Sequence, residues 1–303
     1  MKKADIVRVA RDLYARGENV TQHFKALSLG ADAQVAAIEL AYDLQAGTYT
    51  QGLAENDGLR LQKKQWGAFI ASLLLEYGAR SAVEAGVGEA STLQYVADNA
   101  PLLQYAGFDL SISRLGFAAR MMKQSAAGKA RLFAGDLASI PLIDDAFDAV
   151  LTNHSIESNG GKEREILTQL LRVTRRFLIL VEPDFERAGA EQRTRMERLG
   201  YVRDLPGHLR ELGANVLRYD AWQLNPNPLN AASLIVAEKI GGKHWNDSSD
   251  NVYASPFSGG KLVARTGCLY SEQDGMAFPV IGGFPCLLPS QAVVASNLQD
   301  NLN

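Results

Sequence analysis

The strongest constraint on the fold is an alternation of strand-like and helix-like segments that begins at Ser81. Short apolar runs alternate with helical periodicity as far as residue 182, and two more strand-like runs follow. The expected strands are 80–85, 104–109, 131–135, 148–152, 177–182, 214–223 and 232–239, and the expected helices between them are 90–98, 112–125, 162–174, 188–199 and 205–212. Such alternation predicts an α/β fold with a doubly wound, Rossmann-like sheet of seven strands. Because only the turn-rich segment 225–230 joins the last two strands, we expect an antiparallel edge.

The regions on either side of this sheet have different patterns. Helical periodicity at 3–17, 32–45 and 61–77 predicts a helical N-terminal region over 1–78. Residues 241–251 are polar and rich in glycine and serine, which is typical of a linker. Beyond it, residues 252–303 carry short apolar runs broken by Gly and Pro and predict a small β-rich module. The sheet domain is therefore expected at 79–241.

Composition narrows the range of functions. The chain has 303 residues, 47% of them hydrophobic, and a net charge of −3, as in ordinary globular proteins. It lacks the clustered Lys and Arg of a nucleic-acid surface, so we do not expect a nucleic-acid partner. No apolar run approaches the ~18 residues of a membrane span, and no membrane partner is expected. The two cysteines, Cys268 and Cys286, fit a reducing compartment, so we expect a cytoplasmic protein.

A glycine turn joins the first strand of the sheet to its first helix. Residues 84–88 read Glu-Ala-Gly-Val-Gly, at the carboxyl end of a strand, where open α/β sheets bind ligands. Gly86 and Gly88 allow the backbone to approach a ligand closely. Glu84 favours a cationic ligand, because a carboxylate attracts an ammonium or sulfonium and repels a pyrophosphate. The run continues Glu-Ala-Ser without the third glycine of a dinucleotide turn, so an NAD-dependent enzyme is disfavoured.

Polar residues also end the next three strands. Asp109 lies 23 residues after Gly86, where a carboxylate can accept hydrogen bonds from a ribose diol. Asp136 ends the third strand, where a carboxylate or backbone amide can bond an adenine amino group. The fourth strand runs directly into Asn153 and His154.

Together these motifs resemble the class I methyltransferases that use S-adenosylmethionine, of the methyltransferase type 11 kind. The resemblance rests on Glu-x-Gly-x-Gly at 84–88, Asp109, Gly-Asp-Leu at 135–137 and Phe-Asp-x-Val at 147–150, and it covers about 80–240. It implies S-adenosylmethionine as the cofactor and no metal. It also implies these cofactor-binding residues: Glu84, Gly86 and Gly88 at the methionine part, Asp109 and Leu110 at the ribose, Asp136 and Leu137 at the adenine, and Asn153 near the amino-acid end.

The same resemblance implies that the N-terminal region folds over the cofactor as a lid. Tyr42 and Tyr49 are candidates for cofactor contacts, because aromatic faces attract a sulfonium as they do other cations. Tyr42 and Gln45 are candidates for substrate contacts. The alternative is that Tyr42 belongs to the packing face of its own helix.

The C-terminal module resembles the small zinc-ribbon proteins of the Trm112 type, which act as partners of methyltransferases. The runs YASPFSGGKL at 253–262 and DGMAFPVIGGFPCLLP at 274–289 carry this resemblance. Trm112-type proteins have C-P-x-C near their start, but Ser255 and Ser258 stand at those cysteine positions here. Since Cys268 and Cys286 cannot form a four-thiolate site alone, we expect the fold without structural zinc.

His154 and Glu157 are the candidate catalytic residues. Methyl transfer from a sulfonium mainly requires alignment of the acceptor, and a base helps when the acceptor must lose a proton. His154 is either that base or a loop histidine satisfied by the backbone. Asn159 in the same loop could hold a polar substrate, and Glu182 at the end of the fifth strand could approach the acceptor or stabilise a helix start.

The sequence therefore predicts a methyltransferase that acts on a small polar metabolite or a sugar-like intermediate, with oxygen preferred over nitrogen as the acceptor atom. The alternatives are a methyltransferase of RNA or protein, raised by the Trm112 resemblance, and a non-catalytic S-adenosylmethionine-binding or scaffold protein. The basic stretch 193–203 could meet an anionic substrate or form a solvated helix face. A homodimer is left open.

Overall fold

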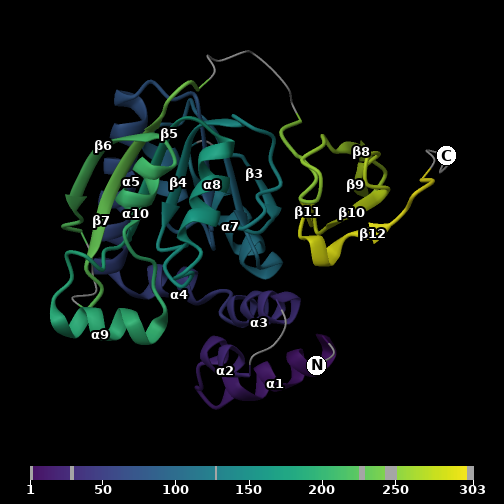
Figure 1. Cartoon of the computed structure of the whole chain (residues 1–303), viewed down its shortest axis with the longest axis horizontal. Helices are drawn as coiled ribbons and strands as arrows, with labels where there is room; N and C mark the ends of the chain where they lie inside the picture. Colours follow the sequence, from purple (N-terminus) through teal and green to yellow (C-terminus); the bar gives the residue numbers. More distant parts are fainter. Residues whose placement is uncertain (1–2, 28–30, 127, 225–228, 243–250, 299–303) are drawn as a thin grey trace.

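The computed structural model describes residues 3–27, 31–126, 128–224, 229–242 and 251–298 (Figure 1). Within these ranges the chain forms a group of N-terminal helices, a seven-stranded sheet covered by helices, and a small C-terminal β module. No helix in the described part of the chain is both long enough and apolar enough to cross a membrane.

The central sheet has the strand order β3-β2-β1-β4-β5-β7-β6. Its strands are β1 (Ser81–Ala85), β2 (Gln104–Asp109), β3 (Ala130–Ala134), β4 (Phe147–Asn153), β5 (Thr174–Pro183), β6 (Ala214–Ala221) and β7 (Ala232–Lys239). Strands β1 to β5 run parallel, and β7 pairs antiparallel with both β5 and β6. This arrangement confirms the predicted α/β fold with an antiparallel edge. The predicted turn between β6 and β7 lies partly outside the described residues, at 225–228.

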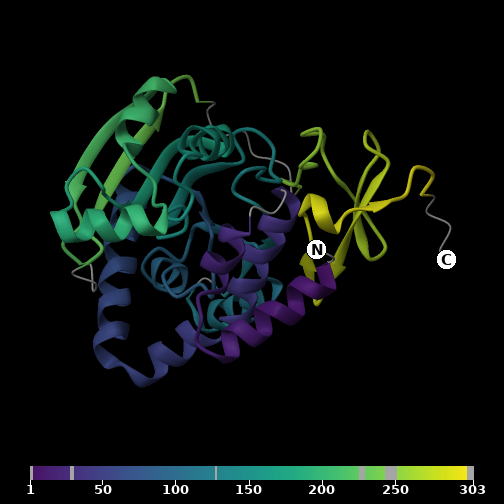
Figure 2. The ribbon, with the colours of Figure 1, turned by 60° about the horizontal axis from the view of Figure 1, so that its bottom comes forward.

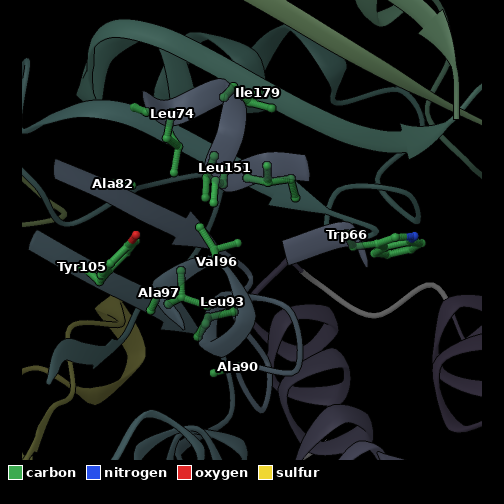
Figure 3. Packing of buried hydrophobic residues seen from close by; sticks show 14 of the residues in the cluster. Trp66, Leu74, Ala82, Ala90, Leu93, Val96, Ala97, Tyr105, Leu151 and Ile179 are labelled. Atoms are coloured by element: carbon green, nitrogen blue, oxygen red, sulfur yellow. The ribbon is translucent and has the colours of Figure 1, made fainter. Parts of the chain in front are cut away.

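Helices cover both faces of the sheet, and its parallel strands are therefore buried on both sides. Side chains of α5 (Asp57–Glu76), α6 (Leu93–Asn99) and α7 (Ile112–Gln124) share one core with Ala82 of β1. Figure 3 shows part of this core, with Leu93 and Val96 of α6 beside the sheet residues Ala82 and Leu151. Val83, the next residue of β1, joins the opposite core, which contains side chains of α8 (Glu163–Val173) and α10 (Leu205–Glu211). Helix α9 (Ala190–Leu199) follows β5.

The N-terminal region contains two helices more than the sequence predicts. Its helices before α5 are α1 (Lys3–Ala15), α2 (Val20–Ala26), α3 (Ala31–Leu44) and α4 (Thr48–Glu55). Helices α1 to α3 share a separate small core that includes Ile6, Leu13 and Phe24. Helix α5 instead packs into the core of the sheet, so the predicted region 1–78 contains two different packing environments.

The C-terminal module forms a second, antiparallel sheet. Its elements are β8 (Val263–Arg265), β9 (Cys268–Ser271), β10 (Met276–Ile281), β11 (Phe284–Pro285), a 3₁₀ turn (Pro289–Gln291) and β12 (Val293–Val294). Figure 2 shows it in yellow as a lobe at one end of the molecule. The backbone N–H of Leu287 donates to Ala134 O of β3 at 2.9 Å, and that of Ala254 donates to Pro141 O at 3.1 Å. The module thus covers the β3 edge, which would otherwise present unpaired backbone groups.

A group of serines surrounds one carboxylate inside this module. Ser258 Oγ and Ser271 Oγ donate to Asp274 Oδ2 at 2.9 and 2.6 Å. Burial would raise the pKa of Asp274, but hydrogen bonds from Ser255, Ser271 and Ser258 outweigh it and lower that pKa. Cys268 and Cys286 are free thiols. Ser255 and Ser258, the residues at the expected zinc-ligand positions, therefore belong to a hydrogen-bonded cluster; the Trm112 resemblance and the absence of zinc stay predictions.

Candidate cofactor and acceptor site

A cavity of about 430 Å³ lies at the carboxyl ends of β1 to β4. This edge is where parallel α/β sheets bind ligands. The predicted site residues that line it are Tyr42, Tyr49, Glu84, Gly86, Gly88, Asp109, Leu110, Asp136, Leu137, Asn153, His154, Glu157 and Asn159. Gln45 lines an adjoining cavity that shares Tyr42 and Ser158, and Glu182 is buried behind the loop that follows β4.

The two glycines of the turn have different local requirements. Gly86 has φ +75°, a backbone conformation that favours glycine. A Cβ at this position would lie 2.3 Å from Ser155 Cβ, so only glycine leaves room for the loop after β4 to cross the turn. Ser155 Oγ fixes this crossing by donating to Ala85 O at 2.7 Å. Gly88 has φ +53° and lies under the guanidinium of Arg114, where a Cβ would be 3.1 Å from Nη2. The turn is therefore shaped by two neighbouring segments as well as by any ligand.

Glu84, which is buried, and Lys63, which is half-buried, lie at one end of the cavity and influence each other's pKa. Burial raises the pKa of Glu84 to about 8, against the opposing effect of the Lys63 charge. Burial likewise lowers the pKa of Lys63 to about 8, and Glu84 counters that shift. The Lys63 ammonium lies 4.1 Å from the centroid of the Trp66 ring and donates to Thr92 Oγ1 at 3.1 Å.

Two buried oxygens beside this pair lack hydrogen-bond partners among the described residues. They are Glu84 Oε2 and Asn153 Oδ1. The amide of Asn153 is oriented by its other end, because Nδ2 donates to Thr92 Oγ1 at 2.7 Å. Unpaired buried acceptors are costly, so this end of the cavity is suited to a ligand that brings hydrogen-bond donors, such as an ammonium group.

Asp109 lies at the end of β2 and faces the same cavity. Its Oδ2 accepts a hydrogen bond from Gly88 N and its Oδ1 one from Ser111 N, both at 3.0 Å. Burial raises the pKa of Asp109, while the Arg114 guanidinium, 4.0 Å away, opposes the shift. Each carboxylate oxygen has two lone pairs, so both retain acceptor capacity for a diol.

Asp136 and Leu137 line the part of the cavity that follows β3. Asp136 Oδ1 accepts a hydrogen bond from Ala138 N at 3.0 Å, which tightens this turn. Phe108 also lines the cavity. This end combines apolar side chains with one carboxylate, a composition suited to a flat, partly polar ring.

Glu89 ties the N-terminal helices to the glycine turn. Its carboxylate is buried and accepts hydrogen bonds from Gly47 N at 2.9 Å, Thr50 N at 2.7 Å and Thr50 Oγ1 at 2.6 Å. A carboxylate at a helix N-terminus also interacts favourably with the helix dipole, so Glu89 stabilises the start of α4. The result is that Tyr42 and Tyr49 are held over Arg114, with ring centroids 5.4 and 5.2 Å from its Cζ.

His154 begins the loop after β4 in a strained backbone conformation. Its φ is +52°, in the left-handed region that non-glycine residues rarely adopt, and its N–H donates to Val181 O at 2.9 Å. The imidazole stacks on Trp66, with centroids 6.1 Å apart and an interplanar angle of 13°. Its Nδ1 lies 3.1 Å from Glu157 Oε2. This contact favours a proton on Nδ1 and leaves Nε2 as the basic atom.

Glu182 supports the loop from behind. Its Oε1 accepts a hydrogen bond from Ser155 N at 3.1 Å, and burial raises its pKa to about 7, with the His154 charge opposing. Its position favours support of the loop over direct contact with a ligand, since Glu182 does not line the cavity.

Sequence reasoning missed several residues that complete the site. Lys63 and Trp66 come from α5, Glu89 from the turn itself, Arg114 from α7, and Asn230 from the segment before β7. Arg195 also lines the cavity; it belongs to the basic stretch 193–203, for which contact with an anionic substrate is one of the two expectations from the sequence. Of the missed residues, only Glu89 had a local signal, as a charged residue directly after the glycine turn. The others reach the cavity through tertiary packing.

Comparison with known proteins supports the same fold and a methyltransferase domain. No curated protein matches the chain. Residues 82–176 match the sequence model of a methyltransferase domain family. Among solved structures, the chain is similar to the magnesium protoporphyrin IX methyltransferase of Synechocystis PCC 6803 with bound S-adenosylhomocysteine. The two sequences are 14% identical, and the match covers 66% of this chain and 98% of that protein, with a TM-score of 0.51. A methyltransferase from Methanosarcina mazei is also 14% identical; the match covers 55% of this chain and 96% of that protein, with a TM-score of 0.48.

At 14% identity the first of these structures establishes the fold, and the match over 82–176 establishes the domain type. That segment runs from β1 to the start of β5 and contributes the turn with Glu84, the acid Asp109 and the loop with His154. The chain thus contains a methyltransferase domain with an α/β, Rossmann-like fold.

Proposed function

We propose that the cavity binds S-adenosylmethionine along the ends of β1 to β3 and that the enzyme methylates a hydroxyl of a small polar or sugar-like acceptor held beside His154. The observation that carries the cofactor assignment is the pair of unpartnered acceptors, Glu84 Oε2 and Asn153 Oδ1, next to the ammonium of Lys63. A methionine group has the matching charges. Its ammonium would donate to Glu84 and Asn153, and its carboxylate would accept from Lys63.

The rest of the cavity fits the other parts of the same cofactor. Asp109 retains acceptor capacity for two ribose hydroxyls, and Asp136 with Leu137 would flank the adenine. The rings of Tyr42, Tyr49 and Trp66 line the cavity and supply aromatic surface around the cofactor. S-adenosylmethionine supplies an activated methyl group for direct displacement.

His154 would remove the proton of the acceptor hydroxyl through Nε2. Glu157 would keep the imidazole oriented and stabilise its positive charge as the proton arrives, because its Oε2 lies 3.1 Å from Nδ1. Tyr201 holds the other oxygen of Glu157 by donating from its hydroxyl at 3.3 Å. Oxygen is preferred over nitrogen as the acceptor atom because this base is useful when a hydroxyl must lose its proton.

The test is methyl transfer from S-adenosylmethionine with a labelled methyl group to a cell extract divided by ultrafiltration. We expect label in the small-molecule fraction, held as a methyl ether whose O–CH3 bond is cleaved under acid conditions that leave N-methyl groups intact. Label confined to RNA or protein would overturn the substrate proposal. Failure of S-adenosylmethionine to bind at millimolar concentration in calorimetry would overturn the cofactor assignment as well.

A further inference from the structure

The acceptor end of the cavity contains a cationic side chain that the protein does not neutralise. Arg195 of α9 lines this cavity, half-buried, and its Nη1 donates to Asn230 Oδ1 at 3.3 Å. Its guanidinium also faces the ring of Tyr201, with Cζ 5.6 Å from the centroid. In the part of the chain that the structure describes, Arg195 forms no ion pair with a carboxylate.

Arg193 and Arg203, two other arginines of the basic stretch 193–203, have contacts of their own. Arg193 donates to the carbonyls of Phe185 and Glu186 at 3.0 and 2.7 Å. Arg203 lies 3.5 Å from Glu197 Oε1. Arg195 differs from both because it lines the cavity, and its hydrogen bonds go to the neutral side chains of Asn230 and Tyr201.

The nearest carboxylate of the acceptor end, Glu157, has a different role. Its two oxygens bond His154 Nδ1 and the Tyr201 hydroxyl. Once His154 takes a proton, Glu157 balances the imidazolium charge. The guanidinium of Arg195 therefore needs a negative charge from elsewhere.

We propose that the methyl acceptor carries an anionic group, a carboxylate or a phosphate, that binds to Arg195 with help from Lys162. This inference rests on the proposed function, because it assigns a substrate class to the same site. Lys162 lines the cavity from its exposed rim. A guanidinium matches carboxylate and phosphate oxygens with paired donors, and partial burial strengthens such a pair.

The position of Arg195 also relates the anionic group to the reacting hydroxyl. Asn230, buried and bonded to Arg195, places its Nδ2 3.4 Å from His154 Nδ1. One amide side chain thus separates the anion site from the base. The acceptor would be a compact hydroxy acid or a phosphorylated hydroxy compound.

The experiment is calorimetric titration of the full chain, saturated with S-adenosylhomocysteine, with glucuronate, glucose 6-phosphate and glucose. We expect both anionic probes, or one of them, to bind at least about tenfold more tightly than glucose. The preferred probe identifies the group as carboxylate or phosphate. Equal binding of glucose, or no binding of either anion at millimolar concentration, would overturn the proposal.

Three variants separate this site from a general charge effect. Arg195→Gln should weaken the preferred anionic probe about tenfold or more and leave glucose unchanged, and Arg195→Lys should restore part of the loss. Lys162→Gln should weaken binding of the preferred anionic probe several-fold; the position is exposed, so this change should not affect folding. Arg198→Gln is the matched control, since Arg198 lies one turn further along α9 and outside this cavity. Equal losses in the Arg195 and Arg198 variants would refute a specific subsite.

The same titrations distinguish this inference from the proposed function. If S-adenosylhomocysteine fails to bind while the anionic probes bind through Arg195, the cofactor assignment fails and the anion site stands. If S-adenosylhomocysteine binds but Arg195→Gln has no effect on the probes, the proposed function stands and the anion site fails.

Discussion

The interaction of Glu84 with Lys63 predicts a particular pH dependence of cofactor binding. In the free protein the pKa of Glu84 is about 8, so this carboxyl is mostly protonated at neutral pH. A bound ammonium would stabilise the carboxylate, so binding should release a proton below pH 8. The association constant should then rise by up to about tenfold per pH unit on approach to pH 8.

Above that pH the dependence should reverse. The pKa of Lys63 is also about 8, so its ammonium loses its proton as the pH rises further. A bound carboxylate would favour the ammonium, and binding should take up a proton. The amino group of the ligand, with an ordinary α-amino pKa of about 7.7–8.0, adds to the same decline. Affinity is thus expected to be greatest near the shared pKa of the two residues.

Two substitutions test which residue causes the rise of cofactor affinity below pH 8 and which causes the fall above it. Glu84→Gln should abolish the rise below the maximum and weaken binding about 10- to 150-fold at the maximum, the value of a charge-assisted hydrogen bond of about 1.5–3 kcal/mol. Above the maximum, Lys63→Met should make the fall in affinity less steep. The part of the fall that remains should be the part caused by the ligand's own amino group. Calorimetry in buffers of different ionisation enthalpy counts the protons directly. Wild-type affinity that is flat below pH 8, with no proton release, would refute the reasoning.

Four further outcomes are expected. His154→Gln should lower the rate of methyl transfer about 100-fold or more without changing cofactor affinity, as measured by single-turnover kinetics and calorimetry; an unchanged rate would exclude it as the base. Glu89→Ala should lower the free energy of unfolding by about 1–3 kcal/mol in urea denaturation, because several part-buried donors lose their acceptor; a loss below the error of the titration would contradict that account of α4. Gly86→Ala should lower the melting temperature, and adding Ser155→Gly should recover part of the loss by removing the Cβ contact; no recovery would argue against the clash as the cause. Melting of the chain should be unaffected by EDTA but lowered by Asp274→Ala, since hydrogen bonds hold that cluster together; a large EDTA effect would indicate a structural metal.

Much of the fold was predictable because its signals are local. The parallel strands are nearly continuous apolar runs, and each ends at a turn or a polar residue such as Asp109 or His154. Since carboxyl ends of parallel strands meet at one edge, the positions of Glu84, Asp109 and Asp136 along the sequence place all three at one cavity.

The missing parts depend on contacts between segments distant in sequence. Helix α4 was not predicted because it is short and has a single buried residue, Leu53, and its N-terminus is stabilised by Glu89 from beyond β1. Lys63 reads as one of several charged residues on α5 until the fold brings it beside Glu84. The contact between Gly86 and Ser155 could not be predicted either, because it depends on how the loop after β4 crosses the glycine turn.

The most direct test of the central claim is a crystal structure of the chain with S-adenosylhomocysteine. The account predicts the homocysteine ammonium on Glu84 and Asn153, the ribose hydroxyls on Asp109, and the sulfur facing the side of the cavity that holds His154. A ligand bound elsewhere, or bound with Glu84 Oε2 still unpaired, would contradict it.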